Sequence, residues 1–392
     1  MKGSERGRDQ GREHDQDQDQ DEGRGHAQGR GKDQRAPRAE APARAVSMTD
    51  VAREVGVSLK TVSRVVNEPE RVRPATRARV EEAMERMGFR ASFAGRTLKT
   101  GRYRCVGLAM LTLYGGNAAV FEGIAGAAAE AGYALTLIKA REDEDLTLAE
   151  IARRMSSLPV DGIIVNLNRA VPDFETYRSP AGLNTVLICP EPHPTCTTVS
   201  DDQEGCTRMA TARLLELGHR TVWYVGGPAW SLAARAREAG WRRALAEAGA
   251  ARVPEPLAGD WTADCGYELG AHLAAEPACT AVVCANDAMA NGVVAALRDA
   301  GRSVPGEVSV VGVDDALAGL VPHVGLSTVR FRHEELGARA FAEAVAGLEA
   351  APGGDAAGAA GAGGAAVGQG AAPRHLLIPG ELIERGSIAP PR

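Results

Sequence analysis

From Val106 to the carboxyl end, short apolar runs alternate with longer segments in which apolar residues recur at helical spacing. The runs are continuous stretches of valine, isoleucine and leucine, which are typical of parallel strands that helices cover on both faces. The plan occurs twice in series, which predicts an α/β protein with two doubly wound lobes and a cleft between them. We expect strands at 106–110, 134–138, 162–165, 185–188, 221–225, 281–284, 308–313 and 376–379, and helices at 121–131, 147–157, 206–217, 233–248 and 288–300.

A purely helical pattern precedes the α/β region. Residues 48–67 fit two short helices joined by a tight turn, and a third helix is expected at 74–88. Thr49 and Ser58 are candidate N-caps, and Gly56 stands where a helix ends in a left-handed residue. The positions expected to face inward are Val51, Ala52, Val55, Val62, Val65 and Val66.

The polar face of the second of these helices has side chains that can bond base edges and phosphates. We therefore favour a helix-turn-helix that binds DNA over an ordinary helical hairpin with a solvated face. Between Val46 and Arg104 there are 13 basic and 7 acidic residues, a local net charge of +6, whereas the whole chain has −6. A basic module on an acidic body fits a protein that binds DNA at one end. The polar face consists of Leu59, Lys60, Thr61, Ser63, Arg64 and Asn67.

Composition divides the chain into four segments. Residues 1–45 have almost no apolar residue, so we expect a disordered polar tail. Residues 46–88 form the all-α headpiece, 89–103 a linker, and 104–392 the two-lobed core. Within the core, residues 350–373 are rich in glycine and alanine and are expected to form a flexible loop.

Composition also narrows the class of protein. The chain has 392 residues, of which 44% are hydrophobic, so a large core can be buried. Its seven scattered cysteines include no CxxC pair and no histidine partners at zinc spacing, so we expect reduced thiols, no metal and no cofactor. The sequence has neither an apolar run of membrane-spanning length nor a signal peptide, so we expect a cytoplasmic protein without a membrane partner.

The stretch MTDVAREVGVSLKTVSRVVN at 48–67 fills almost completely the pattern T-x-x-D-V-A-x-x-x-G-V-S-x-x-T-V-S-R-V-x-N. It resembles the headpiece of the lac-repressor (LacI/GalR) family of transcriptional regulators, for which this pattern is the signature. The resemblance implies that Leu59, Lys60 and Arg64 contact bases, and Lys60 and Arg64 suit guanine O6 and N7. Phosphate contacts are implied for Thr49, Thr61, Ser63 and Asn67.

The linker FRASFAGRTLKTG at 89–101 resembles the hinge helix of the same family. That helix forms on DNA and inserts a leucine into the minor groove, which costs base unstacking and gains a bent, better-wrapped site. Leu98 matches the leucine and Arg96 the hinge arginine, whereas Gly95 replaces an alanine. This glycine should lower helix propensity by about 1 kcal/mol, which makes ordering of the hinge more dependent on DNA. The alternative is a plain linker.

Four polar or aromatic side chains stand near the carboxyl ends of expected strands, where ligands bind in open α/β sheets. Asn286 and Asp314 directly follow apolar strands of the second half, and Arg235 stands at the start of the helix after the strand 221–225. Trp261 follows Gly259 and Asp260. An arginine, an asparagine and an aspartate around an indole suit a sugar. Polar groups bond the hydroxyl pairs, and the aromatic face covers the C–H side of the ring.

Each of these side chains has a structural alternative. Asp287 could cap the helix that follows it, and Asp315 rather than Asp314 could be the ligand-binding carboxylate. Arg235 could pair with Glu238 on the surface, and the tryptophan could simply pack in the core. The shared placement at strand ends favours a binding site.

The segments GHRTVWYVGGP, AARAREAGW, GDW, ANDAMANG and VPGEVSVVGVDD resemble the effector-binding core of the same family, especially its galactoside-responsive members. The resemblance extends from the headpiece to the last strand and implies a periplasmic-binding-protein-like core. It also implies that Arg235, Asn286 and Asp314 hold sugar hydroxyls and that Trp261 stacks on the sugar. One first-lobe position that is an aspartate in those members is Cys189 here.

The sequence therefore predicts a homodimeric, sugar-responsive transcriptional regulator, foremost a repressor, that binds a pseudo-palindromic operator in double-stranded DNA. A sugar in the cleft would change the relation of the lobes, misalign the hinges and weaken DNA binding, and the coupling is reciprocal. Alternatives are a non-galactoside effector or a corepressor, a solute-binding transport component, and an enzyme. The helix-turn-helix argues against transport, and the sequence has no G-x-G-x-x-G after a strand, no P-loop and no G-x-S-x-G.

Overall fold

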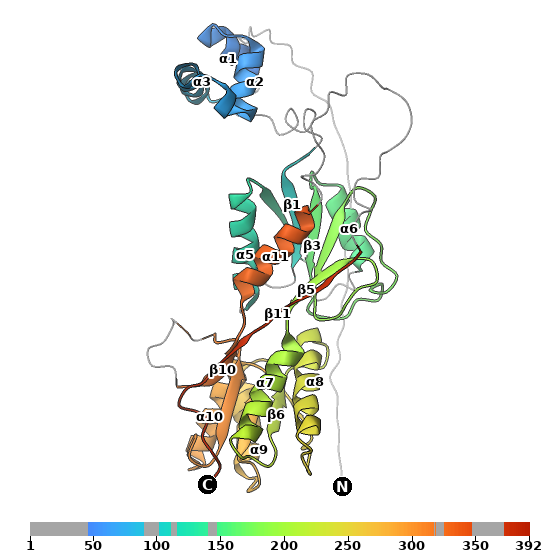
Figure 1. The fold of residues 1–392 in the computed structure, drawn as a ribbon, viewed down its shortest axis with the longest axis vertical. Coiled ribbons are helices and arrows are strands. Elements are labelled where there is room, and N and C mark those ends of the chain that lie inside the picture. Colours follow the sequence, from blue (N-terminus) through green and yellow to red (C-terminus); the bar gives the residue numbers. More distant parts are fainter. Residues whose placement is uncertain are drawn as a thin grey trace, which may run out of the picture. The chain divides into compact units, whose positions relative to one another are not determined.

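The computed structural model divides into two compact units near residue 90, and each unit is described by itself (Figure 1). The first contains the helical headpiece and the second the α/β core. The predictions for the tail 1–45, for Arg96 and Leu98 of the hinge, and for most of the segment 350–373 lie outside the described residues. The structure describes residues 46–89, 102–110, 116–139, 147–316, 318, 325–346 and 372–392.

Within residues 46–89, three α-helices and one short 3-10 helix surround a small apolar centre. The predicted caps Gly56 and Ser58 are confirmed: Gly56 is left-handed with φ 71°, and the hydroxyl of Ser58 accepts from the N–H of Thr61. The expected N-cap Thr49 is wrong, because the N-cap is Ser47, two residues earlier, which forms a capping box with Asp50. The elements are α1 (Met48–Val55), α2 (Leu59–Asn67), η1 (Pro69–Arg71) and α3 (Pro74–Met87).

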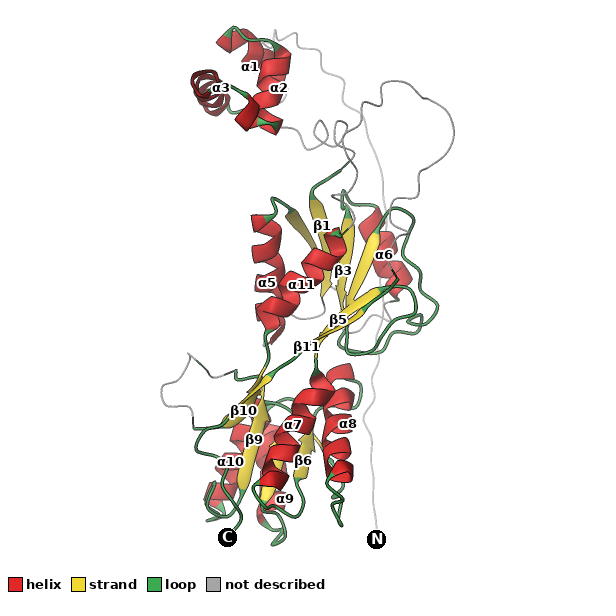
Figure 2. Cartoon of the chain, in the orientation of Figure 1, coloured by secondary structure: helices red, strands yellow, loops and turns green. Residues whose placement is uncertain are grey.

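The first lobe of the core is a parallel sheet with helices on both faces (Figure 2). Alternate residues of its strand β1 point to opposite faces: Leu108 packs with α5 and α11, and Ala109 with α6. Burial on both faces explains why this strand is a continuous apolar run. The strand order is β11 (His375–Ile378), β5 (Thr197–Asp201), β4 (Asn184–Ile188), β3 (Gly162–Asn166), β1 (Cys105–Met110), β2 (Ala134–Lys139), with helices α5 (Gly116–Glu130), α6 (Leu148–Ser156) and α11 (His333–Val345).

The second lobe repeats this plan, except that its edge strand β12 pairs antiparallel with β10. Together the two sheets confirm the predicted pair of doubly wound lobes. The strand order is β12 (Glu381–Ile383), β10 (Ser327–Arg330), β9 (Ser309–Val313), β8 (Ala281–Cys284), β6 (Trp223–Gly226), β7 (Leu257–Ala258), with helices α7 (Gln203–Glu216), α8 (Leu232–Glu247), α9 (Ala263–Ala274) and α10 (Asp287–Asp299).

The described parts of the chain contain no helix that is long and apolar enough to span a membrane. All seven cysteines have free thiols, and six of them are buried. The described residues include no cluster of three or more histidine, cysteine or acidic side chains that could hold a metal ion.

Candidate DNA-binding and effector-binding sites

The outward face of α2 is exposed at its basic and apolar positions and partly buried at its uncharged polar positions. Leu59 is 51% exposed, and Lys60 and Arg64 are exposed as well. Among the described residues, neither Lys60 nor Arg64 has a side-chain hydrogen bond or ion pair. Four other arginines of the headpiece are engaged by carboxylates of the same unit. These pairs are Arg53–Asp50, Arg71–Glu68, Arg77–Glu81 and Arg86–Glu54.

Some of the other side chains that are predicted to contact DNA form hydrogen bonds within the headpiece. The amide nitrogen of Asn67 donates to the backbone oxygen of Ser63 at 2.6 Å, which holds Asn67 against its own helix. The hydroxyl of Thr61 lies 2.8 Å from that of Ser58 at the N-cap. Thr49 is exposed in the first turn of α1. The basic and apolar side chains of α2 are thus more available for DNA than its polar uncharged ones.

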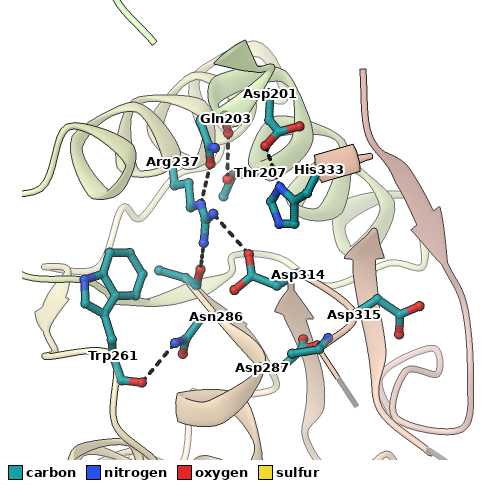
Figure 3. A network of polar contacts seen from close by, with 12 residues as sticks. Asp201, Gln203, Thr207, Arg237, Trp261, Asn286, Asp287, Asp314, Asp315 and His333 are labelled. Carbon is teal, nitrogen blue, oxygen red and sulfur yellow. Dashed lines mark hydrogen bonds and ion pairs between the residues drawn. The ribbon is translucent and has the colours of Figure 1, made fainter. Parts of the chain in front are cut away.

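In the second lobe, the guanidinium of Arg237 on α8 is the centre of a buried polar cluster (Figure 3). Arg237 is 6% exposed, and it donates to the side chain of Gln203 at 2.6 Å and to Asp314 at 3.1 Å. A third hydrogen bond goes to the backbone oxygen of Ala285. A buried charge requires this degree of pairing, because removal from water costs several kcal/mol.

Asp314 faces this cluster from the carboxyl end of β9. Its backbone is left-handed, with φ 104°, which turns the side chain off the strand toward Arg237. Burial raises the pKa of the Asp314 carboxyl, and the nearby charge of Arg237 opposes that rise. A carboxylate that is removed from water and paired with only one arginine is stabilised by further hydrogen-bond donors, and ligand hydroxyls can supply them.

Trp261 lies beside the guanidinium, with the ring centroid 5.6 Å from Cζ of Arg237. Its backbone is left-handed, with φ 77°, and the side-chain nitrogen of Asn286 donates to its carbonyl oxygen at 2.9 Å. A Cβ at Gly227 would lie only 2.4 Å from the indole, so the ring needs a glycine there. Trp261 is partly buried against the second-lobe core and also borders the polar cluster.

Asn286 is the N-cap of α10, since its side-chain oxygen accepts from the N–H of Met289 at 2.9 Å. With its nitrogen bonded to Trp261, both ends of the amide are engaged. Asn286 therefore positions the tryptophan in this structure. The alternative that Asp287 caps this helix is therefore wrong, since Asp287 is buried and accepts from the hydroxyl of Thr328 at 2.6 Å.

The structure does not bring Arg235 into the cluster. Two residues apart on a helix are about 200° apart around its axis, so Arg235 and Arg237 face opposite ways. Arg235 is half exposed, and instead of Glu238 it pairs with Glu191, at 3.4 Å. The ion pair reaches from α8 to the loop after β4, at the edge between the lobes.

The two aspartates after β9 have different partners. Asp315 is buried in an ion-paired group with Arg330 and Arg385, each at 2.7 Å. Asp314 is the aspartate that reaches Arg237. The first-lobe position Cys189 is a buried thiol that donates to the backbone oxygen of Glu191, and burial raises the pKa of the thiol to about 12.

Sequence reasoning missed Arg237 and Gln203, although a signal for Arg237 was present. On α8 the buried face is marked by Ala234, Trp241 and Ala244, and Arg237 falls on that stripe at helical spacing. A charged residue on the apolar face of a helix needs a buried partner, and this singles out the second arginine of the A-R-A-R repeat. Gln203 offered no comparable signal, because polar residues are ordinary in the first turn of a helix.

A helix-turn-helix headpiece joined to two doubly wound lobes defines the class of ligand-controlled DNA-binding regulators. The family model described as bacterial regulatory proteins of the lacI family matches residues 47–92, and that of a periplasmic binding protein-like domain matches residues 211–388. Catabolite control protein A of Priestia megaterium is 30% identical over 300 residues, which cover 75% of this chain and 90% of that protein. The chain belongs to the lacI family of bacterial regulatory proteins, as the headpiece motif predicted.

Two solved structures extend this similarity to the fold. The lac repressor bound to ONPG in the repressed state matches with a TM-score of 0.71 and 25% identity, over 88% of this chain and 100% of that one. The complex of the transcriptional regulator CelR with cellobiose matches with a TM-score of 0.58 and 27% identity, over 87% of this chain and 99% of that one. The predicted headpiece and core architecture is therefore confirmed by known proteins.

Proposed function

We propose that this protein is a sequence-specific DNA-binding repressor that a sugar releases from its operator. One observation carries the proposal: a headpiece with unpaired, exposed Lys60 and Arg64 belongs to the same chain as a core with Arg237, Asp314 and Trp261 in one cluster. The first set suits DNA and the second suits a small polyhydroxylated ligand.

On the DNA side, α2 acts as the recognition helix in the major groove. Lys60 and Arg64 donate to guanine O6 and N7, and Leu59 makes apolar contacts with base edges. Thr49, Thr61, Ser63 and Asn67 face phosphates. The hydrogen bonds of Thr61 to Ser58 and of Asn67 to Ser63 partly restrict this role. The hinge residues Arg96 and Leu98 contribute the minor-groove contact of the family, with Leu98 as the wedge.

On the effector side, a sugar hydroxyl pair bonds to Asp314 and Arg237 while the indole of Trp261 covers the C–H face of the ring. Asn286 holds the indole in place, and Arg235 with Glu191 closes the edge of the site. The CelR–cellobiose complex supports the sugar class, since CelR shares this fold. The alternative within this function is a non-galactoside effector or a corepressor, which the same polar cluster also accommodates.

As a homodimer in the cytoplasm, the protein binds a pseudo-palindromic operator with two headpieces, so protein symmetry matches DNA symmetry. The sugar shifts the relation of the lobes in each subunit, and operator affinity falls by the same factor by which DNA weakens sugar binding. We further propose that the core performs no catalysis, because relatives that this chain matches are named as transcriptional regulators and repressors.

A thermal-shift screen tests the effector site without knowledge of the operator, because a ligand that binds only the native state raises the melting temperature. The ligands are galactose, lactose, cellobiose, glucose, ribose and purines. Variants Arg237→Lys and Trp261→Ala should lose the shift, and Arg235→Ala should retain most of it. A flat response of the wild type to every sugar, or a shift that survives in Arg237→Lys, contradicts the proposed effector site.

A further inference from the structure

Within the described residues, three crossover segments connect the two lobes. Residues 201–203 lead from β5 to α7, residues 330–333 from β10 to α11, and residues 378–381 from β11 to β12. Any change in the relation between the lobes must be absorbed in these segments.

The crossovers are packed against one another. The N–H of Asp202 donates to the carbonyl oxygen of Ile378 at 2.9 Å, which joins the first crossover to the third. A Cβ at Gly380 would lie 2.6 Å from Sγ of Cys206 on α7 and 2.9 Å from the carbonyl oxygen of Arg330, so the third crossover is also in close contact with the second. A shift in one crossover is therefore passed on to the others.

A buried Asp201–His333 pair joins the first crossover to the second. Nδ1 of His333 lies 2.9 Å from Oδ2 of Asp201, and the side chains are 15% and 3% exposed. Burial alone would lower the pKa of His333. The hydrogen bond to Asp201 and the charges of Asp201 and Asp314 outweigh it, so the pKa is raised. In such a buried pair, removing one partner leaves an uncompensated charge, which is strongly destabilising.

This pair borders the proposed effector cluster. Figure 3 shows the imidazole of His333 between Asp201 and Asp314. The ring of Phe331 contacts both His333, with ring centroids 5.5 Å apart, and Arg237, whose Cζ lies 5.1 Å from the ring centroid. The charges that face His333 are Asp201, Asp314 and Arg237. A ligand that draws Arg237 away from Asp314 leaves that carboxylate to attract His333, in competition with Asp201.

Two polar atoms of the pair have no hydrogen-bond partner among the described residues. They are Oδ1 of Asp201 and Nε2 of His333. Nε2 faces the start of α5, where a Cβ at Gly116 would lie only 2.5 Å from it. Buried polar atoms without hydrogen bonds are destabilising. A different arrangement of the crossovers and the first lobe that gives these atoms partners would therefore be stabilised.

We propose that the Asp201–His333 pair is the positioning element through which the effector cluster controls the relation of the two lobes. The pair joins two crossovers, and Asp314 competes with Asp201 for the charge of His333. The unsatisfied atoms of the pair permit a second arrangement of the crossovers and the first lobe. That a sugar is the natural effector rests on the proposed function. The role of the Asp201–His333 pair can be tested without a known effector.

Hydrogen–deuterium exchange of the full-length protein tests the tie between the lobes. The reporter is the N–H of Leu232 in the second lobe, which donates to the carbonyl oxygen of Asn168 in the first at 3.0 Å. In Asp201→Asn and His333→Phe, its exchange should be about tenfold faster or more, while amides of β8 are unchanged. His219→Asn is the control, since His219 is buried within the second lobe against Thr280 and Ser309.

Wild-type exchange rates at Leu232 in both variants would overturn the proposal, as would equal acceleration at β8. If the variants fail to fold, the wild type still tests the tie through pH. Corrected for intrinsic exchange, protection of Leu232 should fall as the pH rises through the raised pKa of His333, because the charged pair is lost. Protection that is independent of pH would contradict the proposal.

A double-mutant cycle tests transmission from the cluster without any sugar. Asp314→Asn should change the exchange of Leu232 in the wild-type background and have little effect in His333→Phe, because the competing partner is gone. Strictly additive effects would show that the pair does not transmit the state of Asp314. Since no ligand is used, failure of this cycle is distinct from failure of the sugar-binding proposal.

Discussion

At the scale of single residues, the core depends on a few buried charges whose partners decide their role. Arg235 and Arg237 are two positions apart on α8. Arg235 is half exposed and pairs with Glu191, whereas Arg237 is buried and pairs with Asp314. Helical spacing on the buried stripe of α8 could have distinguished Arg237 from Arg235, but it could not show which residues would be the partners of Arg237. Those partners are set by packing of the α8 stripe against the core, which is a tertiary property.

Asp287 gives the protein a pH-dependent stability. Burial, followed by the charges of Asp314 and Asp315, raises the pKa of its carboxyl from 3.8 to about 7, while hydrogen bonds from Thr328 and Ala316 oppose the rise. A raised carboxyl pKa stabilises the fold fully below pH 3.8, and this contribution is lost as the pH rises through 7. The loss corresponds to at most roughly 4 kcal/mol.

We therefore expect the melting temperature of the wild type to fall between pH 5 and 8 more steeply than that of Asp287→Asn. Differential scanning calorimetry across this range measures the difference. The exposed Asp264 on α9 supplies the control Asp264→Asn, which should follow the wild type. Parallel profiles for the wild type and Asp287→Asn would refute the role of Asp287.

Gly227 should be required for the position of Trp261. Its replacement by alanine places a Cβ 2.4 Å from the indole, so the ring must move away from Arg237. We expect Gly227→Ala to lose the sugar-induced thermal shift and to cost about 1–3 kcal/mol of stability. In the control Gly126→Ala, the added Cβ has no neighbour within 4 Å, so the shift should persist. An intact shift in Gly227→Ala would contradict the stacking role of Trp261.

At the scale of elements, the sequence predicted most strands and the order of the headpiece, because their apolar spacing is strong. It did not predict α9, whose glycines look like breakers. In the structure Gly266 approaches Met289 of α10 so closely that a Cβ would lie 2.3 Å from its carbonyl oxygen, so tertiary packing stabilises the helix. The sequence also did not predict β5, whose residues are mostly polar. This strand is nevertheless largely buried, and it pairs with β4 on one side and with the distant β11 on the other.

The recognition helix α2 yields a direct prediction for DNA binding. Lys60→Ala and Arg64→Ala should each weaken binding to a selected operator by about 1–3 kcal/mol, since each removes a base-edge donor. Fluorescence anisotropy with DNA enriched from a random pool measures this loss. Arg77→Ala is the matched control, because Arg77 pairs with Glu81 on α3 at 2.7 Å. Equal losses in all three variants would mean that only overall charge matters.

At the scale of the whole molecule, the chain that enters β1 is the covalent connection from the headpiece to the core. The carboxylate of Asp161, 7% exposed, accepts from the N–H groups of Tyr103 and Arg104 at 2.8 and 2.6 Å. These bonds fix the point at which the linker joins the first lobe. We therefore expect that a movement of that lobe is passed to the linker.

Asp161→Ala leaves both amides without this partner and should cost about 1–3 kcal/mol of stability. The sugar-induced thermal shift should remain, because the effector cluster lies in the second lobe, while the effect of the sugar on operator affinity should shrink. Chemical denaturation, thermal shift and anisotropy together separate these results. A variant that keeps the full effect of the sugar on DNA would show that Asp161 is not part of the connection.

The central claim is that a sugar bound at the Arg237–Asp314 cluster controls binding of DNA by α2. The most direct measurement is the dissociation constant for the selected operator, with and without a saturating sugar that raises the melting temperature, for the wild type and for Arg237→Lys. We predict that the sugar weakens operator binding of the wild type by about 1–3 kcal/mol, a 5- to 150-fold change, and leaves Arg237→Lys unaffected. An unchanged constant for the wild type at saturation would contradict the account.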